Sequence, residues 1–70
     1  MNFPNREEVD RIKKLYPEGT KLMVDFMDDI QGISSGTIVT VLLVDDIGQI
    51  HLKEYGLALV PKVDSFHRVG

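Results

Sequence analysis

The apolar residues of this chain change their spacing at Gly19, and this change constrains the fold more than any other feature. Before Gly19, Val9, Ile12 and Leu15 recur at the three-residue spacing of one helix face. After Gly19, apolar and polar residues alternate in short runs separated by turn residues, as in half-buried β-strands. The sequence therefore predicts an N-terminal helix followed by a mainly β domain.

The predicted helix covers residues 5–15. Asn5 is a favourable N-cap, and Glu8 stands three residues later, the spacing of a capping box. Pro17 cannot continue a helix and ends it. With 70 residues the chain forms a single domain, with the helix at about 5–15 and the β part at about 20–69.

Five short strands, with turns every eight to twelve residues, favour a small barrel or sandwich. The predicted strands are Thr20–Met27, Thr37–Val44, Gln49–Lys53, Leu57–Val60 and His67–Val69. Residues 61–66 suit one turn of 3₁₀ helix, and Asp45–Gly48 suit a tight turn because Asp bonds nearby backbone and Gly accepts positive φ. The predicted core is Leu22, Val24, Val41, Ile50, Leu52 and Leu59, with Phe26 on the same face as Leu22 and Val24.

The strand Thr37–Val44 has too many apolar residues for one buried face. With Val41 inward, alternation places Val39 and Leu43 inward as well, and it places Ile38, Thr40, Leu42 and Val44 outward. Three of the four outward residues are apolar, and such a patch on a strand needs a cover. The two candidates are the N-terminal helix and the same strand of a second chain, so Ile38, Leu42 and Val44 are candidate helix or dimer contacts.

Composition narrows the range of functions. There is no cysteine, which excludes disulfides and thiolate metal sites. The net charge of −3 disfavours partners recognised through phosphates, because such binding needs a surplus of Lys and Arg. No apolar run approaches the ~20 residues of a membrane span, and acids stand where a signal peptide has its apolar core. We expect a soluble cytoplasmic protein.

No pattern of residues points to a reaction, a metal or a cofactor. The pairs Asp28-Asp29 and Asp45-Asp46 lack the spacing of an EF-hand and suit turns instead. His51 is expected to point outward, and neither His51 nor His67 has a second ligand at metal-binding spacing. Nucleophile-elbow and phosphate-loop patterns are absent. The sequence predicts no catalytic, cofactor-binding or metal-binding residues, and we expect the protein not to be an enzyme.

Several stretches together resemble a family of small bacterial domains, the domain of unknown function 4314. They are Gly19-Thr20, Met27–Asp29, Gly36-Thr37, Val44–His51 and Leu57–Phe66, and the resemblance runs from about Tyr16 to His67. It implies a small SH3-like antiparallel barrel of about five strands, found in gut bacteria and their mobile elements, and it brings no established activity. Relatives are often Lys, Gly and Thr at positions 38, 39 and 42, where this chain has Ile, Val and Leu.

These observations favour a non-catalytic interaction module with an unknown protein partner, as an accessory protein of a bacterial mobile element. The alternatives are a KOW-like nucleic-acid-associated barrel and an oligomeric structural unit; the protein is expected to be a monomer or a homodimer. In a meander, the turn after the second strand and the segment after the fourth lie at the same barrel end. The candidate partner site there is Asp45, Asp46, Lys62, Asp64 and Phe66, with Phe66 as an aromatic anchor.

Overall fold

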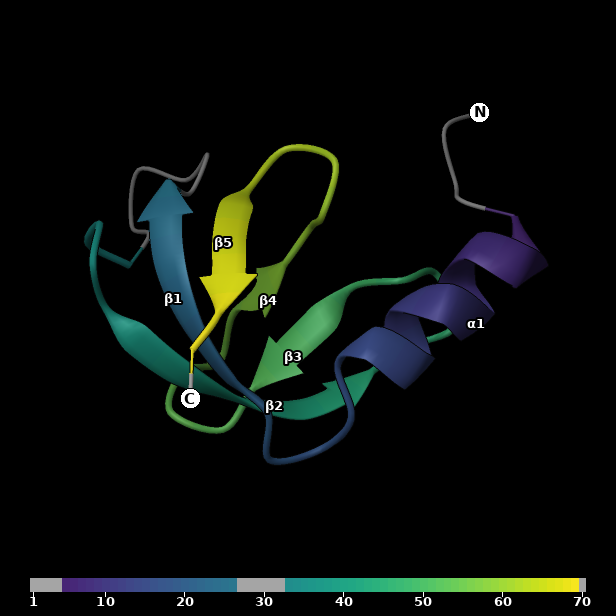
Figure 1. Ribbon diagram of the computed structural model, residues 1–70, viewed down its shortest axis with the longest axis horizontal. Helices are drawn as coiled ribbons and strands as arrows, with labels where there is room; N and C mark the ends of the chain where they lie inside the picture. The colour runs from purple at the N-terminus through teal and green to yellow at the C-terminus, as the bar shows by residue number, and fades with distance from the viewer. Residues whose placement is uncertain (1–4, 27–32, 70) are drawn as a thin grey trace.

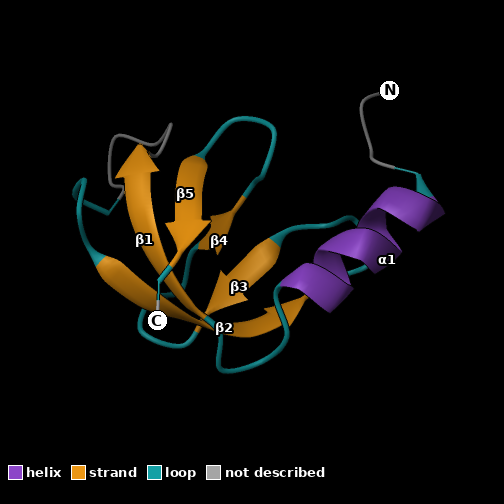
Figure 2. Ribbon diagram, in the orientation of Figure 1, coloured by secondary structure: helices purple, strands orange, loops and turns teal. Residues whose placement is uncertain are grey.

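The protein folds as one helix followed by a five-stranded antiparallel sheet, as the sequence predicts (Figures 1 and 2). The computed structural model describes residues 5–26 and 33–69. The helix is α1 (Arg6–Leu15), and the strands are β1 (Lys21–Phe26), β2 (Ile38–Val44), β3 (Ile50–Leu52), β4 (Ala58–Leu59) and β5 (Ser65–Arg68).

The strand order is β4-β3-β2-β1-β5, so four strands form a meander and the last returns beside the first. Among the described residues β4 and β5 are the two edges and do not pair, so the predicted closure into a barrel is not found. The physical reason lies in the strand lengths. Closure needs a continuous ladder around the ring, and β3 and β4 have only three and two residues.

The N-terminus of α1 is capped as predicted. The Asn5 side chain accepts a hydrogen bond from the Glu8 N–H at 2.8 Å, and the helix proper begins at Arg6. At the other end the Tyr16 N–H donates to the Ile12 carbonyl at 3.0 Å, directly before Pro17. Within residues 5–26 and 33–69, no helix has both the length and the apolar character needed to cross a membrane.

The core is formed by side chains of β1 to β4 together with Ile33, and α1 packs against it. All six residues predicted to be buried are at most 3% exposed, and Val39 and Ile33 join them: Leu22, Val24, Ile33, Val39, Val41, Ile50, Leu52 and Leu59. The helix contributes Val9, which is 4% exposed, while Ile12 and Tyr16 pack partly buried against the same cluster. Val9, Ile12 and Tyr16 therefore complete the core, whereas Leu15, the third residue of the predicted stripe, is 45% exposed.

Two irregularities in strand pairing overturn predictions based on simple alternation. The register of β2 against β3 shifts between Val41 and Leu43, so Leu43 turns outward and Val44 packs half-buried against the core. The predicted orientations of Leu43 and Val44 are thus exchanged. A second shift, between Val24 and Phe26 in the pairing of β1 with β5, leaves Phe26 58% exposed rather than in the core.

The turns follow their predicted chemistry. In Asp45–Gly48 the Gly48 N–H donates to the Asp45 carbonyl at 3.0 Å, and Gly48 has φ of 82°, the conformation that favours glycine. The turn predicted over 61–66 is shorter: the Val63 and Asp64 N–H groups both donate to the Val60 carbonyl, and β5 begins at Ser65, before the predicted start at His67.

Candidate functional site

The Asp45 carboxylate organises the turn that it precedes. Its Oδ1 accepts hydrogen bonds from the N–H groups of Ile47 (3.1 Å) and Gln49 (2.9 Å), and its Oδ2 lies 2.8 Å from His51 Nε2. Burial acts to raise the pKa of Asp45, but the hydrogen bonds from His51 and the two amides outweigh it and hold the pKa below its usual value. Asp45 is thus engaged within its own hairpin.

Asp46 and Lys62, two further members of the predicted partner site, both contact α1. Lys13 Nζ lies 3.1 Å from the Asp46 carboxylate, and Glu8 lies 3.9 Å from Lys62 Nζ. Because Glu8 and Lys13 stand on one helix, α1 lies between the β2–β3 turn and the segment after β4. These two predicted residues therefore both form ion pairs with the same helix.

The last two predicted residues are also used inside the chain. The rings of Phe66 and Tyr16 meet edge to face with centroids 5.6 Å apart, and Phe66 is half-buried against the core. Asp64 is 8% exposed, and its carboxylate accepts a hydrogen bond from the Val60 N–H at 2.7 Å. The aromatic anchor that the sequence predicted for a partner thus holds the protein's own helix.

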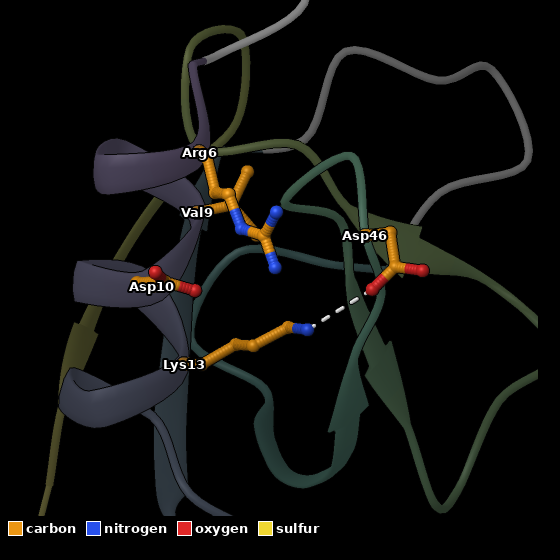
Figure 3. Close-up of a pocket in the computed structure, with 5 residues that line it drawn as sticks. All are labelled: Arg6, Val9, Asp10, Lys13 and Asp46. Carbon is orange, nitrogen blue, oxygen red and sulfur yellow. Dashed lines mark hydrogen bonds and ion pairs between the residues drawn. The ribbon is translucent and has the colours of Figure 1, made fainter.

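A polar groove separates α1 from the β2–β3 turn (Figure 3). It has a volume of about 410 Å³ and is lined by Arg6, Val9, Asp10, Lys13 and Asp46. Arg6 and Lys13 extend from the helix into the groove, and the Lys13–Asp46 ion pair crosses it (Figure 3). The lining holds two cations and two carboxylates, so the groove has no net charge to select an ion.

The outer face of β2 carries apolar side chains that the protein leaves in contact with solvent. Ile38 is 53% exposed, Leu42 is 42% exposed and Leu43 is 48% exposed. The helix does contact β2, and Val44 packs half-buried against the core. Ile38 and Leu42 stay exposed in the single copy, and the contact predicted for them stays a prediction.

Two polar links flank Thr40 at the middle of this outer face. Lys21 on β1 donates to Thr40 Oγ1, and Glu54 after β3 accepts from both the Thr40 N–H (2.8 Å) and the Thr40 hydroxyl (2.7 Å). An ion pair also connects the two sides of β2: Lys53 Nζ, on the β3 side, lies 3.4 Å from the Glu18 carboxylate, on the β1 side. The sequence analysis did not single out Lys21, Glu54 or Glu18, because their pairing depends on where β3 ends.

Within residues 5–26 and 33–69, no three histidine or carboxylate side chains come close enough together to hold a metal ion. His51 pairs with Asp45, and His67 pairs with Asp25 at 2.8 Å. The Asp28-Asp29 pair considered in the sequence lies outside the described residues.

A family model described as a domain of unknown function, DUF4314, matches residues 5–69. The chain belongs to the DUF4314 family. No curated protein and no solved structure matches it. The match to DUF4314 begins at the N-cap Asn5 and ends one residue after β5, so it includes the helix as well as all five strands. In this DUF4314 domain α1 is therefore part of the family unit.

Proposed function

We propose that this DUF4314 domain is a non-catalytic interaction module that contacts a protein partner through the outer face of β2. The observation that carries the proposal is the exposure of Ile38, Leu42 and Leu43 on one strand. Leu42 and Leu43 are adjacent in the strand, and Ile38 lies on the other side of Thr40. Exposed apolar side chains that gather on one element mark contact sites. Both histidines pair with carboxylates, and Asp45 also accepts hydrogen bonds from its own turn, which supports a role without chemistry.

We infer an SH3-like arrangement that stays open between β4 and β5. The return of β5 to the side of β1, after a four-stranded meander, supports it. Long-range contacts measured by NMR between β1 and β5, with none between β4 and β5, are the expected result. Contacts between β4 and β5 would instead support the closed barrel.

The functional proposal is tested by placing a charge on the proposed surface. Leu42→Glu is expected to abolish capture of the native partner from host extract without changing the melting temperature, because an exposed site tolerates the charge in the free protein. Val63→Glu is the matched control, since Val63 is 52% exposed but lies in the loop before β5. Equal capture by both variants and the wild type would remove the outer face of β2 from consideration.

A further inference from the structure

We propose that the partner of the outer face of β2 is a second copy of this chain, in a dimer whose twofold axis runs along β2. This inference rests on the proposed function, because it names the occupant of the same surface. The observation that supports it is the arrangement of charges on the two sides of β2. In one relative orientation of two copies, the cations of each copy lie opposite the anions of the other.

The charges on the two sides of β2 alternate in sign. The β1 side carries Lys21, which pairs with Thr40 in the sheet, and Glu18, which comes shortly before β1. On the β3 side stand Glu54, which accepts from Thr40, and Lys53, whose N–H donates to the Thr40 carbonyl. Within one copy these charges already pair across the strand, because Lys53 Nζ lies 3.4 Å from Glu18 and both Lys21 and Glu54 bond to Thr40. Each cation on one side therefore has an anion at a corresponding place on the other side.

A twofold axis along β2 makes use of this alternation. Such an axis places the β1 side of one copy against the β3 side of the other. Lys21 then faces the partner's Glu54, and Glu18 faces the partner's Lys53. An axis in the interface but perpendicular to β2 would instead set Lys21 against its own counterpart and Glu54 against its own, and like charges brought together oppose association.

The same axis determines how the apolar side chains meet. A closed twofold interface uses one patch on both subunits. With the axis along β2, residues near the axis lie opposite their own counterparts, so Ile38 meets Ile38 and Leu42 meets Leu42. The two sheets would pack face to face, the usual way of burying a second apolar face of a sheet. Ile38 and Leu42, which are exposed in the single copy, are thereby covered.

Cysteine cross-linking tests the orientation cleanly, because the chain contains no cysteine. Ile38→Cys and Leu42→Cys are each expected to give a covalent dimer with a short bis-maleimide reagent. Leu15→Cys, on the exposed side of α1, is the control and is expected to stay monomeric. Preferential linking of Ile38→Cys to Leu42→Cys in a mixture would overturn the axis, because it requires the perpendicular orientation.

Sedimentation equilibrium of the unmodified chain tests the dimer itself. The expected result is a mass that rises from monomer to dimer between low and high micromolar protein, and a dissociation constant raised at least tenfold by Leu42→Glu but unchanged by Val63→Glu. A monomer throughout would overturn the dimer. If Leu42→Glu still abolished capture of a host protein in that case, the interaction module would stand and the homodimer alone would be wrong.

Discussion

Glu54 takes the place of a strand partner for Thr40. The last residue pair between β2 and β3 joins Val41 to Leu52, so the chain turns away before it can offer a carbonyl to the Thr40 N–H. The Glu54 carboxylate reaches back and accepts from both the N–H and the hydroxyl of Thr40, which is 6% exposed. One side chain after the strand thus satisfies polar groups that would otherwise be buried without partners.

Glu54→Ala is expected to destabilise the protein by about 1–3 kcal/mol, the cost of leaving a buried donor without an acceptor. The measurement is the free energy of unfolding in urea. Glu7→Ala, in the exposed first turn of α1, provides the control and should change stability far less. Equal effects from the two substitutions would show that the Glu54–Thr40 hydrogen bonds contribute little.

The same contact predicts a dependence of stability on pH. The hydrogen bond from the Thr40 hydroxyl, followed by that from the Thr40 N–H, lowers the pKa of Glu54 below its ordinary value of 4.5. Because the pKa is lower in the folded state, this contribution is complete above pH 4.5 and is lost as the pH falls through the folded pKa. The stability difference between wild type and Glu54→Gln should therefore shrink on acidification; a constant difference would contradict it.

Phe66 and Tyr16 form a second contact whose energy can be isolated. The edge-to-face pair links β5 to the residue that ends α1. A double-mutant cycle with Tyr16→Leu and Phe66→Leu is expected to give a coupling energy of about 0.5–1.5 kcal/mol in unfolding. Strict additivity of the two substitutions would show that the rings only fill space.

At the scale of elements, α1 is held chiefly by its buried face. Val9→Asp would place an unpaired charge among core side chains, at a cost of several kcal/mol, out of the roughly 5–15 kcal/mol that stabilises a typical domain. Thermal unfolding followed by circular dichroism is expected to show a large fall in melting temperature or no folded state. Leu15→Asp, at a site 45% exposed on the same helix, should unfold like the wild type.

The limits of prediction appear most clearly in β2. Alternation correctly placed Val39 and Val41 in the core and Ile38 outside. It failed at Leu43 and Val44 because the shift in register against β3 inserts an extra residue. The unbroken apolar run at 41–44 was a signal of that bulge, since strict alternation cannot account for four apolar residues in succession. The position of α1 had no comparable signal: its stripe predicted a packed helix but not on which side of β2.

At the scale of the whole molecule, the net charge limits which classes of partner the surface can bind. The net charge is −3, and several of the lysines already lie within reach of a carboxylate, as in Lys13–Asp46 and Lys53–Glu18. We expect no measurable binding to duplex DNA or RNA at physiological salt, because phosphate recognition needs uncompensated cations. Fluorescence anisotropy with labelled duplexes checks this, and salt-dependent binding at low micromolar protein would support the KOW-like alternative.

The order of contacts along the chain has a consequence for synthesis. The helix α1 is made first, but a ten-residue helix is marginal by itself in water. Two of the residues that contact it or its C-cap, Lys62 and Phe66, come after β4, and β1 pairs with β5 as well as with β2. The domain is therefore complete only when β5 has been made, and a chain cut short before β5 lacks both the pairing of β1 with β5 and the Tyr16–Phe66 contact.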